Sequence, residues 1–361
     1  MMIRHLTAAL AVFVITCLVI APHVDAAKPG STAPTTLPAA DGYEATELFD
    51  TVDLLAAINA HLGGGTLDVV AMLGGSSGLA VGAAGVLVLE FEAWDSTDLT
   101  TFADGTQDLS EVVSGLALYT EGGSLAAHVH TSTYWSAGAS SLDYADAWPD
   151  EVRGARLQGV AVAPATAGGL QAGDIVALQW AYDEIDGRGE LQVVRVDLDA
   201  GSTEVLIGWP ASTFGARGQI GVDGAGRIVV GSDGFADATG PVLRRVEQVG
   251  SSWQAEDITP STGIQSFAPL AVAADGTVYT VAPDFGTYDA EIWALDPSTD
   301  TWGWFADFDQ RCCVREFRTM TVDSDGDLFA ALGSPRQAGD YIAPVASGDS
   351  VAWGDRIAET T

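Results

Sequence analysis

The chain has 361 residues and a formal net charge of −34, because 49 aspartates and glutamates outnumber 15 lysines and arginines. Binding to nucleic acid requires a cationic surface, so this composition excludes nucleic acid as a partner and disfavours anionic membranes. The charge is typical of a soluble, strongly hydrated surface, with adaptation to salt or binding of divalent cations as alternatives.

The N-terminus has the pattern of an export signal. Arg4 precedes an apolar run from Leu6 to Ala21, and Val24-Asp25-Ala26 offers small residues at the two positions that a signal peptidase recognises. The run is shorter than the roughly 20 residues of a membrane-spanning helix, and no later stretch is apolar enough to cross a bilayer. We therefore expect residues 1–26 to be a signal peptide, no transmembrane segment after cleavage, and a secreted or periplasmic mature protein.

Two short segments follow the signal. Residues 27–42 are rich in Pro, Ser, Thr and Ala and predict a disordered leader. Residues 43–65 carry apolar side chains at helical spacing and end in three glycines, which predicts one N-terminal helix.

The remaining residues, 66–361, repeat one short apolar pattern of a large, a small and a large residue. It is entered in most copies by Gly or Pro and followed in most by a Gly-containing turn and a second apolar run. The six copies begin at Leu79, Leu116, Val160, Ile220, Leu270 and Met320. Recurrence at this spacing is a signature of repeat architectures, and small central residues suit strands that converge on an axis.

The fifth copy predicts a complete four-stranded unit. Strands are expected at 270–273, 278–282, 291–296 and 301–305, with a tight hairpin turn at Asp275-Gly276. The fourth copy predicts the same plan over 220–258, and the sixth predicts strands up to 350–353. We therefore expect an all-β fold, a six-bladed β-propeller of four-stranded antiparallel blades, with a β-sandwich as the alternative.

The segment from Pro269 to Tyr279, Pro-Leu-Ala-Val-Ala-Ala-Asp-Gly-Thr-Val-Tyr, resembles the NHL repeat and the six-bladed propellers of the gluconolactonase and paraoxonase type. The resemblance implies a divalent metal at the channel mouth, held typically by Glu, Asn and Asp. The chain departs from that ligand pattern, because its one asparagine, Asn59, precedes the propeller.

Carboxylates and imidazoles near predicted strand ends are the candidate metal ligands. Alignment of the second strands on their turn glycines brings six residues to one rim, and alternation along a strand puts the paired ones on one side. These residues are Glu90, Glu92, His128, His130, Asp233 and Asp284. Such a set suits zinc or calcium, whereas the alternative is that they are solvated or capping residues at strand ends.

Further candidates lie in the loops. The adjacent Cys312 and Cys313 predict a strained vicinal disulfide in an exported protein, with two free or intermolecularly paired thiols as the alternative. Three arginines beside them form either an anion clamp or local salt bridges, and two tryptophans of a long insertion could line a sugar or apolar ligand site. These residues are Arg311, Arg315, Arg318, Trp135 and Trp148.

The sequence favours an exported, monomeric propeller that binds a small molecule, a glycan or an envelope protein at one face, without established catalysis. The alternative is a metal-dependent hydrolase of the lactonase or esterase type, with its site at the channel mouth. A purely structural or envelope-interaction role is the third possibility, because propellers host unrelated functions.

Overall fold

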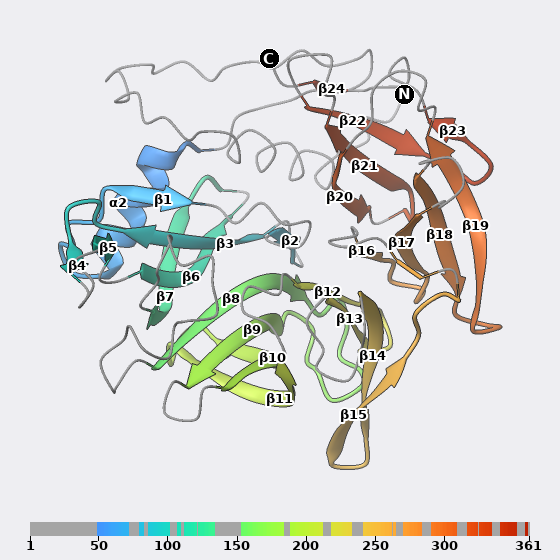
Figure 1. The fold of residues 1–361 in the computed structure, drawn as a ribbon, viewed down its shortest axis with the longest axis horizontal. Coiled ribbons are helices and arrows are strands. Elements are labelled where there is room, and N and C mark those ends of the chain that lie inside the picture. The colour runs from blue at the N-terminus through green and yellow to red at the C-terminus, as the bar shows by residue number, and fades with distance from the viewer. Residues whose placement is uncertain are drawn as a thin grey trace.

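A computed structural model of the chain describes residues 49–71, 79–82, 86–101, 107–109, 112–120, 122–133, 153–183, 188–211, 218–232, 241–261, 263–264, 270–283, 290–308, 316–323, 325–333, 340–351 and 358–359. The predicted signal peptide and leader lie outside these residues. In the part described, five sheets, antiparallel except for one short parallel pair, are arranged around one axis as the blades of a propeller (Figure 1). The propeller fold is confirmed, whereas the prediction of six blades is wrong and five are found.

The strands follow the chain from blade to blade. The first blade contains β1 (Val69–Ala71), β2 (Leu79–Val81), β3 (Leu87–Trp94), β6 (Val112–Tyr119) and β7 (Leu125–Thr133). The second contains β8 (Arg153–Val162), β9 (Ile175–Asp183), β10 (Arg188–Asp197) and β11 (Ser202–Ala211). The third contains β12 (Gly218–Val222), β13 (Ile228–Ser232), β14 (Val242–Val249) and β15 (Ser252–Asp257).

The fourth blade contains β16 (Leu270–Val272), β17 (Val278–Pro283), β18 (Ala290–Asp296), β19 (Thr301–Phe308) and β23 (Ser350–Val351). The fifth contains β20 (Glu316–Val322), β21 (Leu328–Gly333), β22 (Asp340–Val345) and β24 (Ala358–Glu359). A separate two-stranded sheet pairs β4 (Leu99–Thr101) with β5 (Gln107–Leu109).

The blade count was overestimated because one apolar triplet belongs to a different strand of the repeat. Leu116-Ala117-Leu118 lies in β6, where it pairs with β3 on one side and β7 on the other. It is therefore the middle of the first blade and not the start of a second. The other five triplets lie in β2, β8, β12, β16 and β20, and each of these strands contacts the next in this order.

The small central residue of these inner strands is required by close packing. A Cβ atom added at Gly221 in β12 would lie 2.5 Å from Cγ2 and 2.9 Å from Cβ of Val272, on the inner strand of the fourth blade. Adjacent inner strands approach too closely at this point for a second side chain, as the taper of a propeller requires.

The predicted N-terminal helix is found as α2 (Thr51–His61), packed on the first blade (Figure 1). It begins with a capping box, in which Asp50 Oδ1 accepts a hydrogen bond from the backbone N–H of Asp53 at 2.8 Å. Leu54 and Ile58 are fully buried and join a hydrophobic cluster with Phe91. One face of the first blade is thus covered by a helix, which leaves the other face for the second blade.

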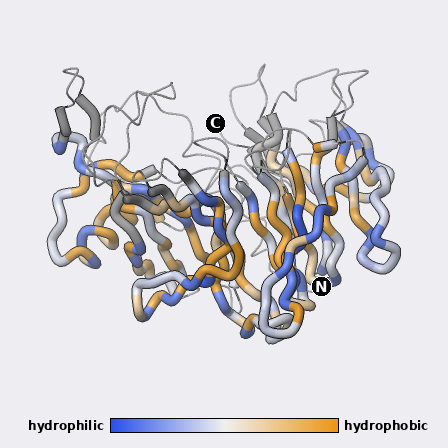
Figure 2. Tube along the Cα trace, turned by 60° about the horizontal axis from the view of Figure 1, so that its bottom comes forward, coloured by the Kyte–Doolittle hydropathy of each residue, from blue (hydrophilic) through white to orange (hydrophobic). Residues whose placement is uncertain are grey.

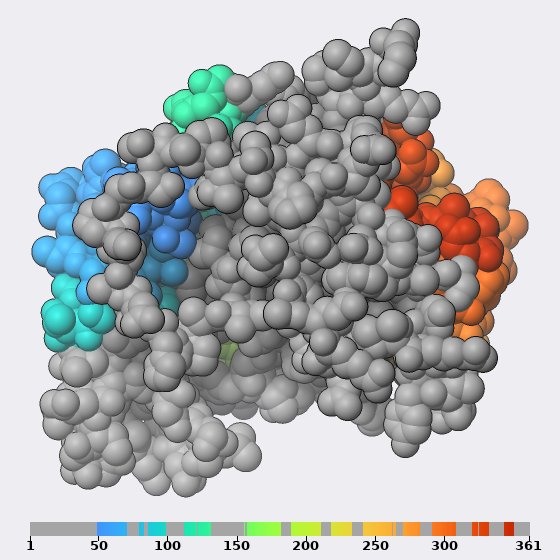
Figure 3. All heavy atoms as spheres, turned by 90° about the horizontal axis from the view of Figure 1, so that it is seen from above, coloured from blue at the N-terminus to red at the C-terminus, as the bar shows by residue number. Residues whose placement is uncertain are grey.

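Side chains alternate between the two faces of each blade. The second, third and fourth blades therefore pack against both neighbours, whereas hydrophobic clusters join the first blade to the second and the fifth to the fourth. Figure 2 shows hydrophobic residues along the strands and hydrophilic residues at many turns. Seen from above, the described residues of the first blade lie on one flank, opposite those of the last two blades (Figure 3).

A backbone hydrogen bond also joins the third and fourth blades at their turns. Gly224 N–H donates to the carbonyl of Ala274 in the neighbouring turn at 2.8 Å. Within the first of these turns, buried Asp223 accepts from the backbone N–H groups of Ala225 and Arg227 at 2.9 Å each and pairs with the Arg227 guanidinium at 2.6 Å. The contacts of Asp223 hold the shape of the first turn, and the Gly224–Ala274 hydrogen bond connects it to the second.

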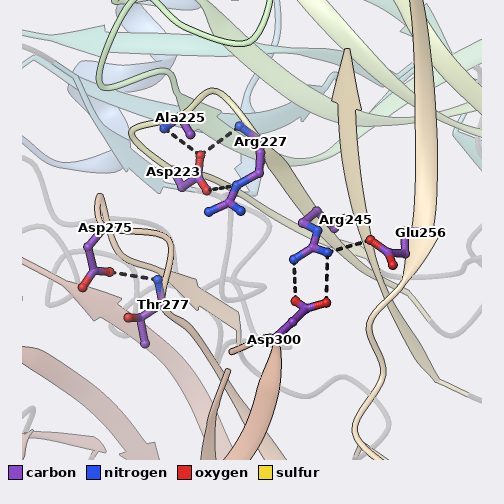
Figure 4. A network of polar contacts seen from close by, with 8 residues as sticks. All are labelled: Asp223, Ala225, Arg227, Arg245, Glu256, Asp275, Thr277 and Asp300. Carbon is purple, nitrogen blue, oxygen red and sulfur yellow. Dashed lines mark hydrogen bonds and ion pairs between the residues drawn. The ribbon is translucent and has the colours of Figure 1, made fainter. Parts of the chain in front are cut away.

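A second connection joins the outer strands of the same two blades. Arg245 of β14 forms ion pairs with Asp300 of the fourth blade at 2.7 Å and with Glu256 of β15 at 2.6 Å (Figure 4). The hydrogen bond to Asp300 raises the pKa of Arg245, and the same contact lowers the pKa of Asp300. Asp300 adopts a φ of 54°, a left-handed conformation that aspartate adopts more readily than most residues.

The end of the fifth blade differs from the prediction. Residues 350–353 were expected to form its fourth strand, but β23 pairs in parallel with β19 of the fourth blade. The fourth strand of the fifth blade is β24, which pairs with β22. The connection after β22 therefore crosses to the neighbouring blade before the chain returns.

Candidate functional site

Four of the six predicted metal ligands lie in the first blade. Glu90 and Glu92 are on β3, and His128 and His130 are on β7, so the assignment of the histidines to a second blade is wrong. Glu90, Leu116 and His128 nonetheless occupy one cross-strand row, with β6 between the glutamate and the histidine. Asp233 and Asp284 lie outside the described residues.

The two glutamates belong to the face of the first blade that meets the second. Val88 and Leu116, on that face, pack in one cluster with Leu157 of β8. Because alternate residues of a strand share a face, Glu90 and Glu92 lie on this face too. The backbone N–H of Leu157 donates to Ser114 Oγ at 3.2 Å, which joins the two blades in the same seam. We call this contact region the first seam.

The first seam is closed to solvent. The residue exposures of Glu90 and Glu92 are 1% each, and Ser114 is fully buried. On the side of the second blade, Gln179 is buried as well and donates to Gln192 Oε1 at 3.3 Å. The carboxylates predicted at an open rim are therefore enclosed between two blades.

Three histidines meet at the outer side of the first blade. His61, in the last turn of α2, lies beside His128, with 5.6 Å between the ring centroids. His130 lies at a β-bulge of β7, and its ring nitrogens are buried without a hydrogen-bond partner among the described residues. Burial first, and then the nearby His128 and His61, lower the pKa of His130 to about 4. His130 is thus neutral at physiological pH.

The described residues do not fit a metal centre. Nowhere in the part of the chain that the structure describes do three His, Cys, Asp or Glu side chains gather so that they could hold an ion. His130, a partly exposed residue with buried ring nitrogens, is the group of this cluster whose pKa is shifted. Sequence reasoning missed His61, because its approach to His128 depends on how α2 docks on the blade, and no local pattern encodes this.

The other predicted site residues lie largely beyond the description. Trp135, Trp148, Arg311, Arg315, Cys312 and Cys313 are outside the described residues. Arg318 is on β20, and the structure describes only its backbone. The ligand clamp, the aromatic site and the vicinal disulfide therefore stay predictions.

The fold defines the class of protein as a β-propeller. No family model matches the chain, and no curated protein matches its sequence. Among solved structures, TolB from Acinetobacter baumannii is 11% identical with a TM-score of 0.40 and coverage of 72% of this chain and 60% of that one. The chain thus spans about three fifths of the TolB chain.

Two further solved structures are similar in fold. A gluconolactonase from Xanthomonas campestris is 15% identical, with a TM-score of 0.35 and coverage of 83% of this chain and 87% of that one. A Hadza microbial sialidase is 10% identical, with a TM-score of 0.43 and coverage of 76% and 52%. These neighbours are similar in architecture alone.

Proposed function

We propose that this chain is an exported propeller that binds a ligand or a protein partner and does not catalyse a reaction. The observation that carries the proposal is the enclosure of Glu90 and Glu92 in the first seam, each at 1% exposure. A general acid or base must come within hydrogen-bond reach of its substrate, and a catalytic metal needs an open coordination position. Neither requirement is met by carboxylates packed between two blades.

The net charge of the chain limits the chemical class of the proposed partner. At −34, the protein attracts cationic groups and repels phosphates and other anions over distances of about a Debye length, near 10 Å at 0.1 M salt. The proposed ligand therefore carries positive charge. Among the described residues, no helix is long and apolar enough to span a membrane.

The first test separates binding from hydrolysis. Purified protein is analysed for bound metal and assayed against a panel of lactones and esters, with and without added calcium or zinc. We expect no stoichiometric metal and no turnover above that of buffer. Metal-dependent turnover that disappears in Glu92→Gln, and persists in the equally charge-reducing control Asp199→Asn, would overturn the proposal.

A thermal-shift screen supplies the positive result. Compounds that bind only the folded state raise the melting temperature in proportion to the logarithm of their concentration. We expect small organic cations to raise it, whereas matched anions and neutral sugars leave it unchanged. A rise caused only by anions contradicts the proposed charge of the ligand.

A further inference from the structure

The outer strands of the fourth blade carry two aromatic and two acidic side chains side by side. Trp293 pairs with Trp304 across β18 and β19, and Glu291 pairs with Asp307 two residues further along β18. Leu295 and Trp302 pack toward the third blade in the cluster with Leu243 and Ile258. The four residues therefore lie on the face of the fourth blade that meets the third blade, next to the hydrophobic contact between the two blades.

A β-bulge is what brings Trp304 and Asp307 to one face. They are three residues apart, which in a regular strand puts side chains on opposite faces. The register shifts between Ile292 and Trp293, and Phe305 is the extra residue. Phe305 and Ala306 pack toward the fifth blade, so Trp304 and Asp307 both face the third. Bulges commonly redirect a side chain at functional positions.

The aromatic part of this patch is accessible. Trp304 is 46% exposed, which is unusual for the largest apolar side chain. Trp302, two residues earlier, is only partly exposed and donates its indole N–H to the carbonyl of Ile258 at 2.6 Å. Trp302 thus completes the packing between the blades, whereas a large part of Trp304 is left for contact with something else.

The acidic part of the patch is held in place and has unused hydrogen-bonding capacity. Glu291 Oε2 accepts from the indole N–H of Trp293 at 2.9 Å, which fixes the carboxylate beside the ring. Asp307 Oδ1 is buried and has no hydrogen-bond partner among the described residues. A buried acceptor without a donor calls for a water, an ion or a ligand group that supplies one.

We propose that Trp293, Trp304, Glu291 and Asp307 bind a guanidinium group, as on an arginine side chain. A guanidinium is flat and stacks on an indole face, and its five N–H donors pair with carboxylates. Its N–H donors can pair with the carboxylates of Glu291 and Asp307, both of which belong to partly exposed residues. A quaternary ammonium has no N–H and satisfies only the aromatic half of the patch.

The net charge of −34 favours such a ligand before contact, through long-range attraction. The inference rests on the proposed binding function, to which it adds a place and a chemical group. It does not involve the first seam or the three histidines.

The test is a calorimetric titration of the full protein with N-acetyl-arginine amide in low-salt buffer. N-acetyl-citrulline amide has the same shape without the charge, and choline has the charge without the N–H donors. We expect binding of the arginine compound, with each of the two others weaker by about tenfold or more. Equal binding of citrulline amide or of choline would overturn the assignment to a guanidinium.

Variants locate the site. Trp304→Ala and Asp307→Asn are each expected to raise the dissociation constant about tenfold, whereas Trp304→Phe, which keeps an aromatic face, raises it less. Asp199→Asn on the second blade changes the net charge equally and serves as the control. Circular dichroism checks the fold, and Glu291→Gln replaces any variant that fails to fold. Unchanged affinity in the site variants would exclude this patch.

The two proposals fail in distinguishable ways. Turnover of a lactone or an ester would overturn the binding function and leave this titration standing. Absence of arginine binding, with no turnover and with other cations raising the melting temperature, would overturn the site alone.

Discussion

The first and fourth blades are both five-stranded sheets, but they bury different polar groups. The first blade is covered on one face by α2 and encloses Glu90 and Glu92 on the other. The fourth blade packs apolar side chains toward both neighbours, and its charged side chains are more accessible: Asp300 pairs with Arg245, and Glu291 and Asp307 are partly exposed. The comparison shows that position in a repeat fixes the backbone plan, whereas the neighbouring surface decides which polar groups are enclosed.

The largest loss of stability is expected when a glycine of the first blade is replaced by a larger residue. A Cβ atom at Gly115 would lie 2.7 Å from Cζ of Phe91 and 3.0 Å from the backbone Cα of Val129. Gly115→Val should therefore destabilise the fold by about 3 kcal/mol, the upper range for overpacking. The measurement is urea unfolding, followed by circular dichroism.

Gly303 on β19 is the matched control in the fourth blade. It is exposed, and no atom lies within 4 Å of an added Cβ. Gly303→Val should leave the free energy of unfolding within about 0.5 kcal/mol of the original. Equal losses in both variants would contradict the difference in packing between the two blades.

As the pH is lowered, the first blade should lose stability at a higher pH than the fourth blade does. His130 stays neutral in the folded chain down to about pH 4, whereas a solvated histidine takes up its proton near pH 6.5. Between these values the unfolded chain binds more protons, so stability falls as the pH drops from 6.5 to 4. We expect a loss on the order of 1–2 kcal/mol, reduced from the full linkage value because the ring is only partly enclosed.

The histidine contribution can be isolated by comparing the original chain with His130→Gln. Urea unfolding at pH 7 and at pH 5 should show a smaller pH-dependent loss in the variant. An identical loss in both proteins means that His130 is not the group responsible.

A smaller effect is expected at the rim of the fourth blade. Arg245→Met keeps the apolar stem and removes the pairs with Asp300 and Glu256, at a cost of about 0.5–1 kcal/mol at pH 7. Because the pKa of Asp300 lies below its ordinary value of 3.8, its contribution is present above that pH and is lost as the pH falls further. The difference between the original chain and Arg245→Met should shrink below pH 3.8, as measured by chemical unfolding.

The smallest expected change in stability is the one caused by salt. Raising sodium chloride from about 0.05 to 0.5 M screens exposed pairs, so part of the difference between the original chain and Arg245→Met should disappear. The difference between the original chain and Gly115→Val, which comes from packing, should not change. If salt also changed the stability difference caused by Gly115→Val, the contrast between packing in the first blade and ion pairs in the fourth would be wrong.

The sequence predicts the third and fourth blades closely because their signals are local. The turn at Asp275-Gly276 is found with Gly276 at a φ of 96°, and β18 spans Ala290–Asp296 where a strand was predicted at 291–296. The first blade was mispredicted because Leu116-Ala117-Leu118 alternates like an inner strand, and alternation does not reveal which strands are its partners. Partner choice is a long-range property.

The same limit applies to the candidate sites. Glu90 and His128 were grouped on a mistaken assignment to equivalent strands of two blades, yet they share a row because β6 lies between their strands. The bulge at Phe305 that brings Trp304 and Asp307 to one face has no sequence signal. Arg245 and Asp300 are 55 residues apart and meet only when the blades pack.

The pairing of β23 with β19 has a consequence for how the protein unfolds. Gly348 N–H donates to the carbonyl of Phe305 at 2.7 Å, and Asp307 N–H donates to that of Asp349 at 3.0 Å. The backbone that leaves the fifth blade is therefore hydrogen-bonded along the edge of the fourth, so neither sheet can detach without exposing amides of the other. The last two blades should open as one cooperative unit in hydrogen exchange, with the amide of Asp307 on the fourth blade reporting the loosening of the fifth.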